Sequence, residues 1–182
     1  AGNYTIAVVE ISDFVPFVTF TVNVTVDPTA PVPTLSHAEG TVAAGTMISA
    51  TAGTAGSGGV SGSADDYEYS IDGGSSWLPY NLGDAIGTTT YMLSSVKIKA
   101  LRQHPDGLGC YTENIYTWTV DSRVHDISGT MGSYYNIQQA INNVNTLPGD
   151  ILEVEAGTYE EEITVNKQVE LRGPNYMIPG NG

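Results

Sequence analysis

The sequence predicts a mainly β protein, and three observations lead to this prediction. A unit of two alternating segments that ends in Thr-Val-Asp occurs twice, at residues 3–27 and 96–121. Between the two ends lie about seven short alternating runs with turn signals, which is the spacing of a β-sandwich. One short helical pattern and further β-runs then follow. The predicted fold is a β-sandwich, with a partial hairpin before it and a helix with short strands after it.

The repeated unit sets the predicted domain boundaries. Its first copy reads NYTIAVVEISDFVPFVTFTVNVTVD and its second reads VKIKALRQHPDGLGCYTENIYTWTVD. The second strand of each copy alternates with the period of two that half-buried strands show. The closing residues, Asp27 and Asp121, are 94 positions apart, which is the length of one sandwich domain. We therefore predict the terminal hairpin of an incomplete domain at 1–27 and a complete sandwich at 28–121.

The elements of the predicted sandwich follow in chain order. Strands other than the hairpin are expected at 31–35, 47–52, 89–93, 96–101 and 114–121. The segment TAGTAGSGGVSGSADD, residues 51–66, is too rich in Gly and Ser for regular structure and predicts a flexible loop. The segment YEYSIDGGSSWLPY predicts a tight hairpin, because Asp72-Gly73-Gly74 supplies positive-φ positions. Tyr67, Tyr69 and Ile71 share one side of its first strand, and Trp77 packs across from the return strand.

Two short motifs carry a resemblance over residues 1–121. The linker DPTAP contains two prolines, which fix φ and remove backbone donors, so that it ends a strand and stiffens the joint. Together with the hairpin motif YSIDGGSSW, this junction resembles tandem immunoglobulin-like repeats of bacterial surface proteins and adhesins. The resemblance implies an immunoglobulin-like β-sandwich in a secreted or cell-surface, extracellular protein.

The third predicted part of the chain, residues 122–182, begins with a helix. The segment SYYNIQQAINNVNTLPGD places apolar residues three and four positions apart, at Ile137, Ala140, Ile141 and Val144. Asn136 or Ser133 is expected to cap the first turn, and Pro148-Gly149 ends the pattern. Short strands are then expected at 151–155, 163–165 and 169–171.

A helix followed by GDILEVEAGTYEEEITVNKQVELRG carries a second resemblance, over residues 133–175. It is similar to the N-terminal cap and first coil of right-handed parallel β-helix proteins of the pectin-lyase-like superfamily. The resemblance implies that the helix covers the open apolar end of the coil. The side chains that it places in the core are Ile151, Val154, Ile163, Val165, Val169 and Leu171.

Composition excludes several classes of protein. Six Lys and Arg against 20 Asp and Glu give a net charge of −14, which argues against nucleic acid as a partner. No run of 18 or more apolar residues is present, so no membrane span is expected. The single cysteine, Cys110, rules out an internal disulfide bond. Two N-glycosylation triplets begin at Asn3 and Asn23.

The sequence shows no catalytic constellation, and we expect no enzyme activity. The run Glu160–Glu162 alternates between two faces of a strand, so it does not form an acid–base pair. A solvated run is the better account of it. Other candidates that we expect to be solvated are His37, His104, His125, Lys167 and Arg172.

No cofactor is expected from the sequence, and among the site hypotheses weighed, calcium is the best supported. Ca²⁺ takes six to eight oxygen ligands, which loops rich in aspartate supply. Interdomain aspartates of the resembling adhesin repeats point to Asp27, with Asp65, Asp66 or Asp121 as helpers. The chain lacks the D-x-D-x-D spacing of a calcium loop.

Two functions from different classes remain open. The first is a structural stalk or fibre segment of an extracellular multidomain protein, used in adhesion or in self-assembly into filaments through exposed β-edges. Its partners would be neighbouring copies or further domains of the same chain. The alternative is the non-catalytic N-terminal portion of a polysaccharide-active β-helix enzyme. A carbohydrate-binding role of the sandwich through Trp77, Tyr80 or Tyr91 is weighed against core packing of these rings.

Overall fold

The computed structural model describes most of the chain. The described residues are 2–8, 18–24, 26–59, 61–103, 112–129 and 131–177, with side chains described from residue 28 onward. Within them the protein is mainly β, with five sheets and one short helix, as the sequence predicts. The chain forms two compact units. The first comprises Ala1–Pro33, Ala52–Tyr67 and Lys99–Asn114, and the second comprises Thr34–Thr51, Glu68–Ile98 and Ile115–Gly182.

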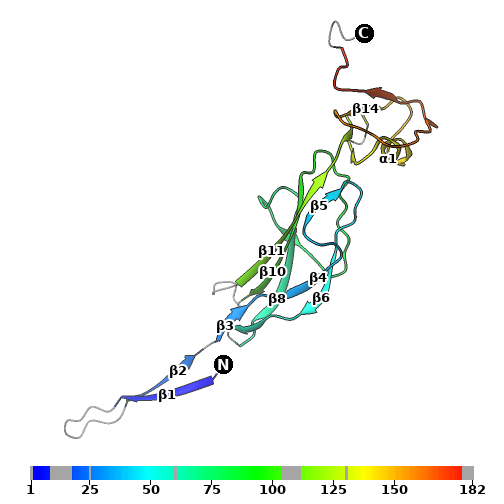
Figure 1. Ribbon diagram of the computed structural model, residues 1–182. Helices are drawn as coiled ribbons and strands as arrows, with labels where there is room; N and C mark the ends of the chain where they lie inside the picture. Colours follow the sequence, from blue (N-terminus) through cyan, green and yellow to red (C-terminus); the bar gives the residue numbers. More distant parts are fainter. Residues whose placement is uncertain are drawn as a thin grey trace, which may run out of the picture. The chain divides into compact units, whose positions relative to one another are not determined.

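The first unit contains the N-terminal hairpin. Strand β1 (Gly2–Val8) pairs antiparallel with β2 (Val18–Val24), so that Gly2 lies opposite Val24 and Val8 opposite Val18. The alternation at residues 3–8 and 18–24 therefore does correspond to two paired strands, and residues 9–17 lie outside the described part of the chain (Figure 1).

The prediction of a flexible loop at 51–66 is wrong. Strand β6 (Ala50–Thr54) overlaps the start of this segment, and strand β7 (Ser57–Gly59) lies inside it. Strand β8 (Ala64–Ser70) begins inside it. Strand β7 pairs antiparallel with β3 (Val26–Thr29). The composition of the segment is that of a linker, but its backbone forms ladder hydrogen bonds with another strand.

Gly56 shows why this segment needs a small residue rather than flexibility. Its amide donates to the Asp65 carboxylate at 2.9 Å. A Cβ atom at this position would lie 2.5 Å from Asp65 Oδ1 and 2.6 Å from the Thr29 carbonyl oxygen. The glycine is therefore required by the close approach of two backbone segments.

A five-stranded sheet has the order β5-β11-β10-β8-β9. The bounds of the strands not yet given are Gly40–Ala43 (β5), Leu78–Pro79 (β9), Ser95–Gln103 (β10) and Thr112–Asp121 (β11). Strand β11 is parallel to β5, with Trp118 opposite Gly40 (Figure 1). Strand β8 is antiparallel to β9. A separate two-stranded sheet pairs β4 (Val32–Leu35) with β6.

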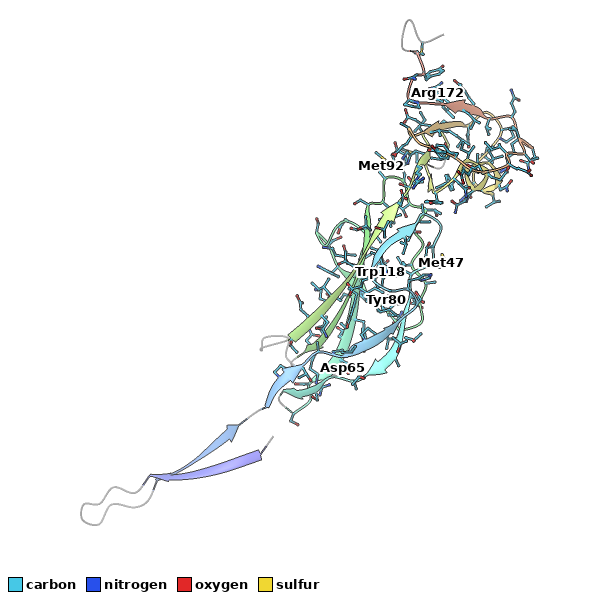
Figure 2. All side chains as sticks on the ribbon, in the orientation of Figure 1. Met47, Asp65, Tyr80, Met92, Trp118 and Arg172 are labelled. Carbon is cyan, nitrogen blue, oxygen red and sulfur yellow. The ribbon has the colours of Figure 1, made fainter. Side chains whose placement is uncertain are left out.

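The core of the second unit includes side chains from this sheet and from the segments beside it. Trp118 is completely buried, and its indole Nε1 donates to the Ala38 carbonyl oxygen at 2.9 Å (labelled in Figure 2). In β10, Val96 and Ile98 are buried while the intervening Lys97 is half-buried, which is the predicted alternation. Further buried apolar residues of this unit are Ala44, Ile48, Ala50, Tyr80, Ile86, Leu93 and Val120.

Two of the predicted strands do not form as expected. The segment 89–93 is not a strand, because its backbone turns and makes only an isolated bridge between Thr90 and Gly132. Met92 in this turn has a φ of 57°. Residues 163–165 are also not a strand.

The predicted tight turn after β8 is present and is held by one carboxylate. Gly73 and Gly74 have φ values of 76° and 95°. The Asp72 carboxylate accepts hydrogen bonds from the Ser70 hydroxyl at 2.7 Å, the Ser76 amide at 2.9 Å and the Ser76 hydroxyl at 2.5 Å. The hydrogen bonds from Ser76, followed by that from Ser70, hold the pKa of Asp72 well below its ordinary value of 3.8.

This turn gives a prediction on pH dependence. Because the folded pKa of Asp72 is depressed, its contribution to stability is complete above about pH 3.8 and is lost as pH falls through the lower folded value. Asp72→Asn should therefore lower the melting temperature at neutral pH, and the difference from the wild type should shrink progressively below pH 3.8. Thermal melts between pH 7 and pH 2 measure this. The exposed Glu162→Gln serves as the control, and a pH-independent difference would contradict the prediction.

A four-stranded sheet near the C-terminal end of the described chain has the order β13-β12-β14-β15. Its strands are Val124–Asp126 (β12), Ser133–Tyr134 (β13), Ile151–Val154 (β14) and Glu170–Arg172 (β15). Strand β12 is antiparallel to both β13 and β14, whereas β14 and β15 are parallel. Ile151 lies opposite Glu170, so the chain returns to the neighbouring position after 19 residues.

Helix α1 (Ile137–Asn142) is shorter than its sequence pattern. Asn136 caps it as expected, since its side-chain oxygen accepts from the Gln139 amide at 2.8 Å. Val144 lies outside the helix and is 82% exposed, so its predicted place on the apolar face is wrong. The buried cluster under the helix consists of Val124, Tyr134, Ile137, Ala140, Ile141 and Leu152.

Candidate functional site

The open edge of the C-terminal sheet is the first candidate site. Strand β15 is the last strand in the order, and within the described residues only β14 pairs with it. The Glu170 amide donates to the Asp150 carbonyl oxygen at 2.9 Å, so the backbone groups of Glu170 face β14. Because successive residues of a strand point their backbone groups to opposite sides, the amide of Leu171 faces the open edge. Such an edge is a template for pairing with another strand.

Three apolar side chains of the C-terminal region are exposed, and one of them, Leu171, lies on the edge strand. Ile163, Val165 and Leu171 are 41%, 58% and 41% exposed. The resemblance to a β-helix coil implies that they lie in the core, and this expectation is wrong for all three. Leu152, which is completely buried, has the central place instead, with Val154 and Val169 packed against the cluster. For Ile163 and Val165 the reason is that residues 156–169 form no strand, so their side chains do not alternate between a core and a surface. Leu171 is in β15, at the edge of the sheet.

Residues 156–169, which we call the covering segment, are positioned along helix α1 by side-chain contacts. The Glu161 carboxylate accepts from the Ile137 amide at 2.9 Å and from the Gln138 amide at 2.8 Å. Helix α1 has no acidic residue in its own first turn, so Glu161 supplies the acceptors that the free amides there require. The interpretation of Glu160–Glu162 as a solvated run is therefore wrong for Glu161.

Two further contacts continue along the covering segment. The Gln138 side-chain amide accepts from the Thr164 amide at 2.6 Å and donates to the Thr164 carbonyl oxygen at 3.3 Å. The Lys167 ammonium donates to the carbonyl oxygens of Asn143 at 2.5 Å and Thr146 at 2.9 Å. Lys167, expected to be solvated, thus satisfies carbonyl groups just beyond the helix. Sequence spacing gave no signal for these contacts, because they join residues more than 20 positions apart.

Arg172 lies at the end of β15 and contacts two residues close to it in the sequence, Glu170 and Tyr176. Its Nε atom lies 2.8 Å from Glu170 Oε1, and its guanidinium stacks 4.5 Å from the centre of the Tyr176 ring (Arg172 is labelled in Figure 2). The ion pair with Glu170 raises the pKa of Arg172 and lowers that of Glu170. Both side chains carry charge next to the open edge, where charge limits indiscriminate pairing.

His125 is the second candidate, and its expected place on the surface is wrong. It is 7% exposed. Its Nδ1 atom lies 2.9 Å from the Ser133 hydroxyl, and its Nε2 atom lies 3.0 Å from Glu155 Oε1. The ring also meets Tyr91 edge to face, with 6.2 Å between centres. The structure thus brings together a serine, a histidine and a carboxylate that the sequence did not connect.

The geometry of this trio is unsuited to nucleophilic catalysis. Ser133 is completely buried, and its hydroxyl already accepts a hydrogen bond from the Met92 amide at 2.9 Å. The Glu155 side chain, by contrast, is 56% exposed. A catalytic serine must reach the substrate while its acid is shielded from solvent. Here the serine is buried and the carboxylate is exposed. The trio connects β12, β13 and the turn at Met92 as a structural network.

The four aspartates predicted to bind calcium are not gathered into one group. Asp65 is bound by Arg102 at 2.9 Å, and Asp121 is bound by Arg123 at 3.0 Å. Asp66 accepts from the Tyr67 amide at 2.9 Å. The side chain of Asp27 is outside the described residues. In the described part of the chain no group of three or more His, Cys, Asp or Glu side chains is arranged to hold a metal ion, and calcium at these positions stays a prediction.

Tyr80, weighed as a sugar-binding aromatic, is used inside the protein. It is 6% exposed, and its hydroxyl contacts the Ala50 amide and the Asp84 carbonyl oxygen, both at 2.7 Å (Figure 2). Burial raises the pKa of this hydroxyl. Its ring edge faces Tyr69 at 6.3 Å. These contacts favour the core-packing role for Tyr80.

Comparisons with family models, with curated proteins and with solved structures find no match to this chain. The described residues contain no helix of the length and apolarity that crossing a membrane requires. His104, Cys110 and the turn between them lie outside the described residues, as do the side chains of Asn3 and Asn23. The expectations for these residues stay predictions.

Proposed function

We propose that the protein is a structural segment, a stalk or fibre part of an extracellular multidomain protein, that associates by adding a β-strand at the open edge of β15. The observation that carries the proposal is this edge, which combines an outward-facing Leu171 amide with the exposed Leu171 side chain. The partner is a strand from a neighbouring copy or from a further domain. The acidic charge of −14 fits a protein that works in solution at an exposed surface.

Two finer parts of the fold belong to this proposal. The five-stranded sheet and the separate β4–β6 pair support an immunoglobulin-like sandwich. The parallel β14–β15 pair, in which the chain returns to the neighbouring position after 19 residues, supports the first coil of a parallel β-helix. Helix α1 supports the cap of this coil. In such a coil every strand pairs with the equivalent strand of the next one. The edge of β15 is then the place where the next strand adds.

The alternative function is the non-catalytic portion of a polysaccharide-active β-helix enzyme. One observation favours it, a cavity of about 400 Å³ lined by Arg123, Tyr135, Tyr159 and Glu160 among others. Aromatic rings with neighbouring polar groups suit sugar rings. Saturable binding of a neutral oligosaccharide that Tyr135→Ala removes would favour this alternative over the structural role.

Substitutions at Leu171 test the proposed edge. Leu171→Pro removes the amide that faces the open edge and keeps the amide of Glu170 that bonds to β14, and Leu171→Lys adds a charge that opposes pairing. We expect the wild-type chain to form concentration-dependent oligomers or fibres, and both variants to stay monomeric at the same concentration. Analytical ultracentrifugation and electron microscopy measure this.

Leu147→Ala is the matched control, because Leu147 is an exposed leucine outside the edge strand. It should leave the association unchanged. A wild-type chain that is monomeric at every concentration would contradict pairing between copies, and association that both Leu171 variants preserve would contradict the edge of β15 as its site.

A further inference from the structure

Two buried carboxylates outside the predicted calcium set border the same glycine. Asp126, at the end of β12, is completely buried, and Asp150, just before β14, is 8% exposed. The Gly129 amide donates to Asp126 Oδ1 at 2.9 Å. A Cβ atom at Gly129 would lie 2.5 Å from Asp150 Oδ2. Both carboxylates therefore lie next to Gly129, in the C-terminal sheet region.

Only part of this cluster is satisfied by hydrogen bonds. Asp126 Oδ1 accepts from the amides of Ser128 at 3.0 Å and Gly129 at 2.9 Å, whereas Asp126 Oδ2 has no partner. The hydroxyl of Thr146, a residue that is 1% exposed, also has no partner of hydrogen-bond geometry. Unsatisfied buried oxygen atoms are rare, and each requires an explanation.

The turn before β14 brings Thr146 to the same carboxylates. The amide of Leu147, the residue after Thr146, donates to Asp150 Oδ2 at 2.7 Å. Asp150 in turn borders Gly129, whose amide donates to Asp126. The pKa of Tyr134 agrees with this placement: burial is the main cause that raises it, the Thr146 side chain lowers it, and the charges of Asp126 and Asp150 raise it.

Charge decides what kind of ligand fits this region. Among the described residues neither aspartate forms an ion pair with a basic side chain, and the Lys167 ammonium is held by two carbonyl groups. A buried carboxylate without a counter-charge costs on the order of several kcal/mol. A water molecule would supply hydrogen bonds but no counter-charge. A cation supplies a partner for the oxygen atoms and also the counter-charge.

We propose that Asp126 Oδ2, the Asp150 carboxylate and the Thr146 hydroxyl bind a hard cation with the chemistry of Ca²⁺. The three groups offer only oxygen, which Ca²⁺ prefers and which Zn²⁺ or copper sites seldom use alone. Water completes the shell of about six to eight oxygen atoms that the ion requires. The ion stabilises the folded state because the unfolded chain does not assemble these ligands.

Terbium luminescence gives a direct test, because Tb³⁺ replaces Ca²⁺ and emits when a nearby tyrosine is excited. The full chain, treated with EDTA and dialysed, should show tyrosine-sensitised Tb³⁺ emission that saturates and that excess CaCl₂ displaces. Asp126→Asn keeps an acceptor for the amides of Ser128 and Gly129 but removes the charge. It should weaken Tb³⁺ binding about ten-fold or more. Glu153→Gln, an exposed carboxylate on β14, is the matched control and should change nothing.

Thr146→Val supplies a second, independent readout. In EDTA it should leave the melting temperature unchanged or raise it, because it removes an unsatisfied hydroxyl. In CaCl₂ its gain in melting temperature should be smaller than that of the wild type. The proposal is overturned if the wild type shows no sensitised emission and no calcium-dependent melting, or if Asp126→Asn and Thr146→Val bind as tightly as the wild type. The last result would place the ion elsewhere, for example at the aspartates predicted from the sequence.

Discussion

Trp118→Ala is expected to lower the free energy of unfolding by about 3–5 kcal/mol. Trp118 is completely buried, and its Nε1 atom lies 2.9 Å from the Ala38 carbonyl oxygen and 3.2 Å from that of His37. Truncation removes the largest completely buried side chain, leaves a cavity and leaves these carbonyl groups without their donor. Urea denaturation followed by circular dichroism measures the change without relying on tryptophan emission.

Trp118→Phe separates packing from hydrogen bonding. It retains much of the ring volume and loses the indole donor, so its cost should be clearly smaller, at about 1–2 kcal/mol. A loss below about 1 kcal/mol for Trp118→Ala would mean that the interior around β11 can collapse onto the cavity. That result would contradict a close-packed core at this position.

Leu152→Ala is expected to cost about 2–5 kcal/mol. Leu152 is completely buried in the cluster beneath helix α1, and it lies directly opposite Leu171 in the parallel β14–β15 pair. Leu171→Ala is therefore a matched control, with the same substitution on the neighbouring strand at a side chain that is 41% exposed. Its cost should stay within about 1 kcal/mol.

The comparison of these two leucines also tests which of them is buried in the core of the C-terminal region. If the implied β-helix core were right, Leu171→Ala would be the more costly of the two substitutions. Equal losses would show that both side chains are buried in solution, for example because association covers the edge of β15. Repeating the denaturation at two protein concentrations distinguishes burial within the chain from burial between chains.

Elements controlled by local chemistry could be predicted from the sequence. The alternation of Val96 and Ile98 in β10, the turn at Gly73-Gly74 and the cap at Asn136 all depend on residues within a few positions of one another. The mainly β class follows from many such local signals added together. In these places the local preference and the tertiary structure agree.

Elements controlled by distant partners could not be predicted. The Gly-rich segment at 51–66 forms strands because β3 and the Asp65 side chain give its backbone partners. Residues 163–165 have the composition of a strand, but contacts of Glu161 and Gln138 place this segment along the helix instead. Propensity is a weak guide where a neighbouring segment supplies the hydrogen bonds.

The candidate sites could be predicted from the sequence even less than the fold. Asp65 and Asp121 are acidic residues of the kind that bind calcium, but arginines at distant or adjacent positions neutralise them. Asp126, at the end of β12, and Asp150, just before β14, are 24 positions apart in the sequence, and only folding brings both next to Gly129. An unsatisfied oxygen atom is a property of three-dimensional packing and leaves no pattern in the chain.

The hydrogen bonds around His125 have a fixed direction. When the imidazole ring is neutral, Nε2 carries the proton, because the ionised Glu155 carboxylate can only accept, and Nδ1 is the acceptor. The Ser133 hydroxyl then donates to Nδ1 while it accepts from the Met92 amide. The donors of this neutral form run one way, from the Met92 amide to the exposed Glu155 carboxylate, and select one imidazole tautomer. Replacing Glu155 with glutamine, whose amide both donates and accepts, removes this selection and allows the ring to exchange between its two neutral forms.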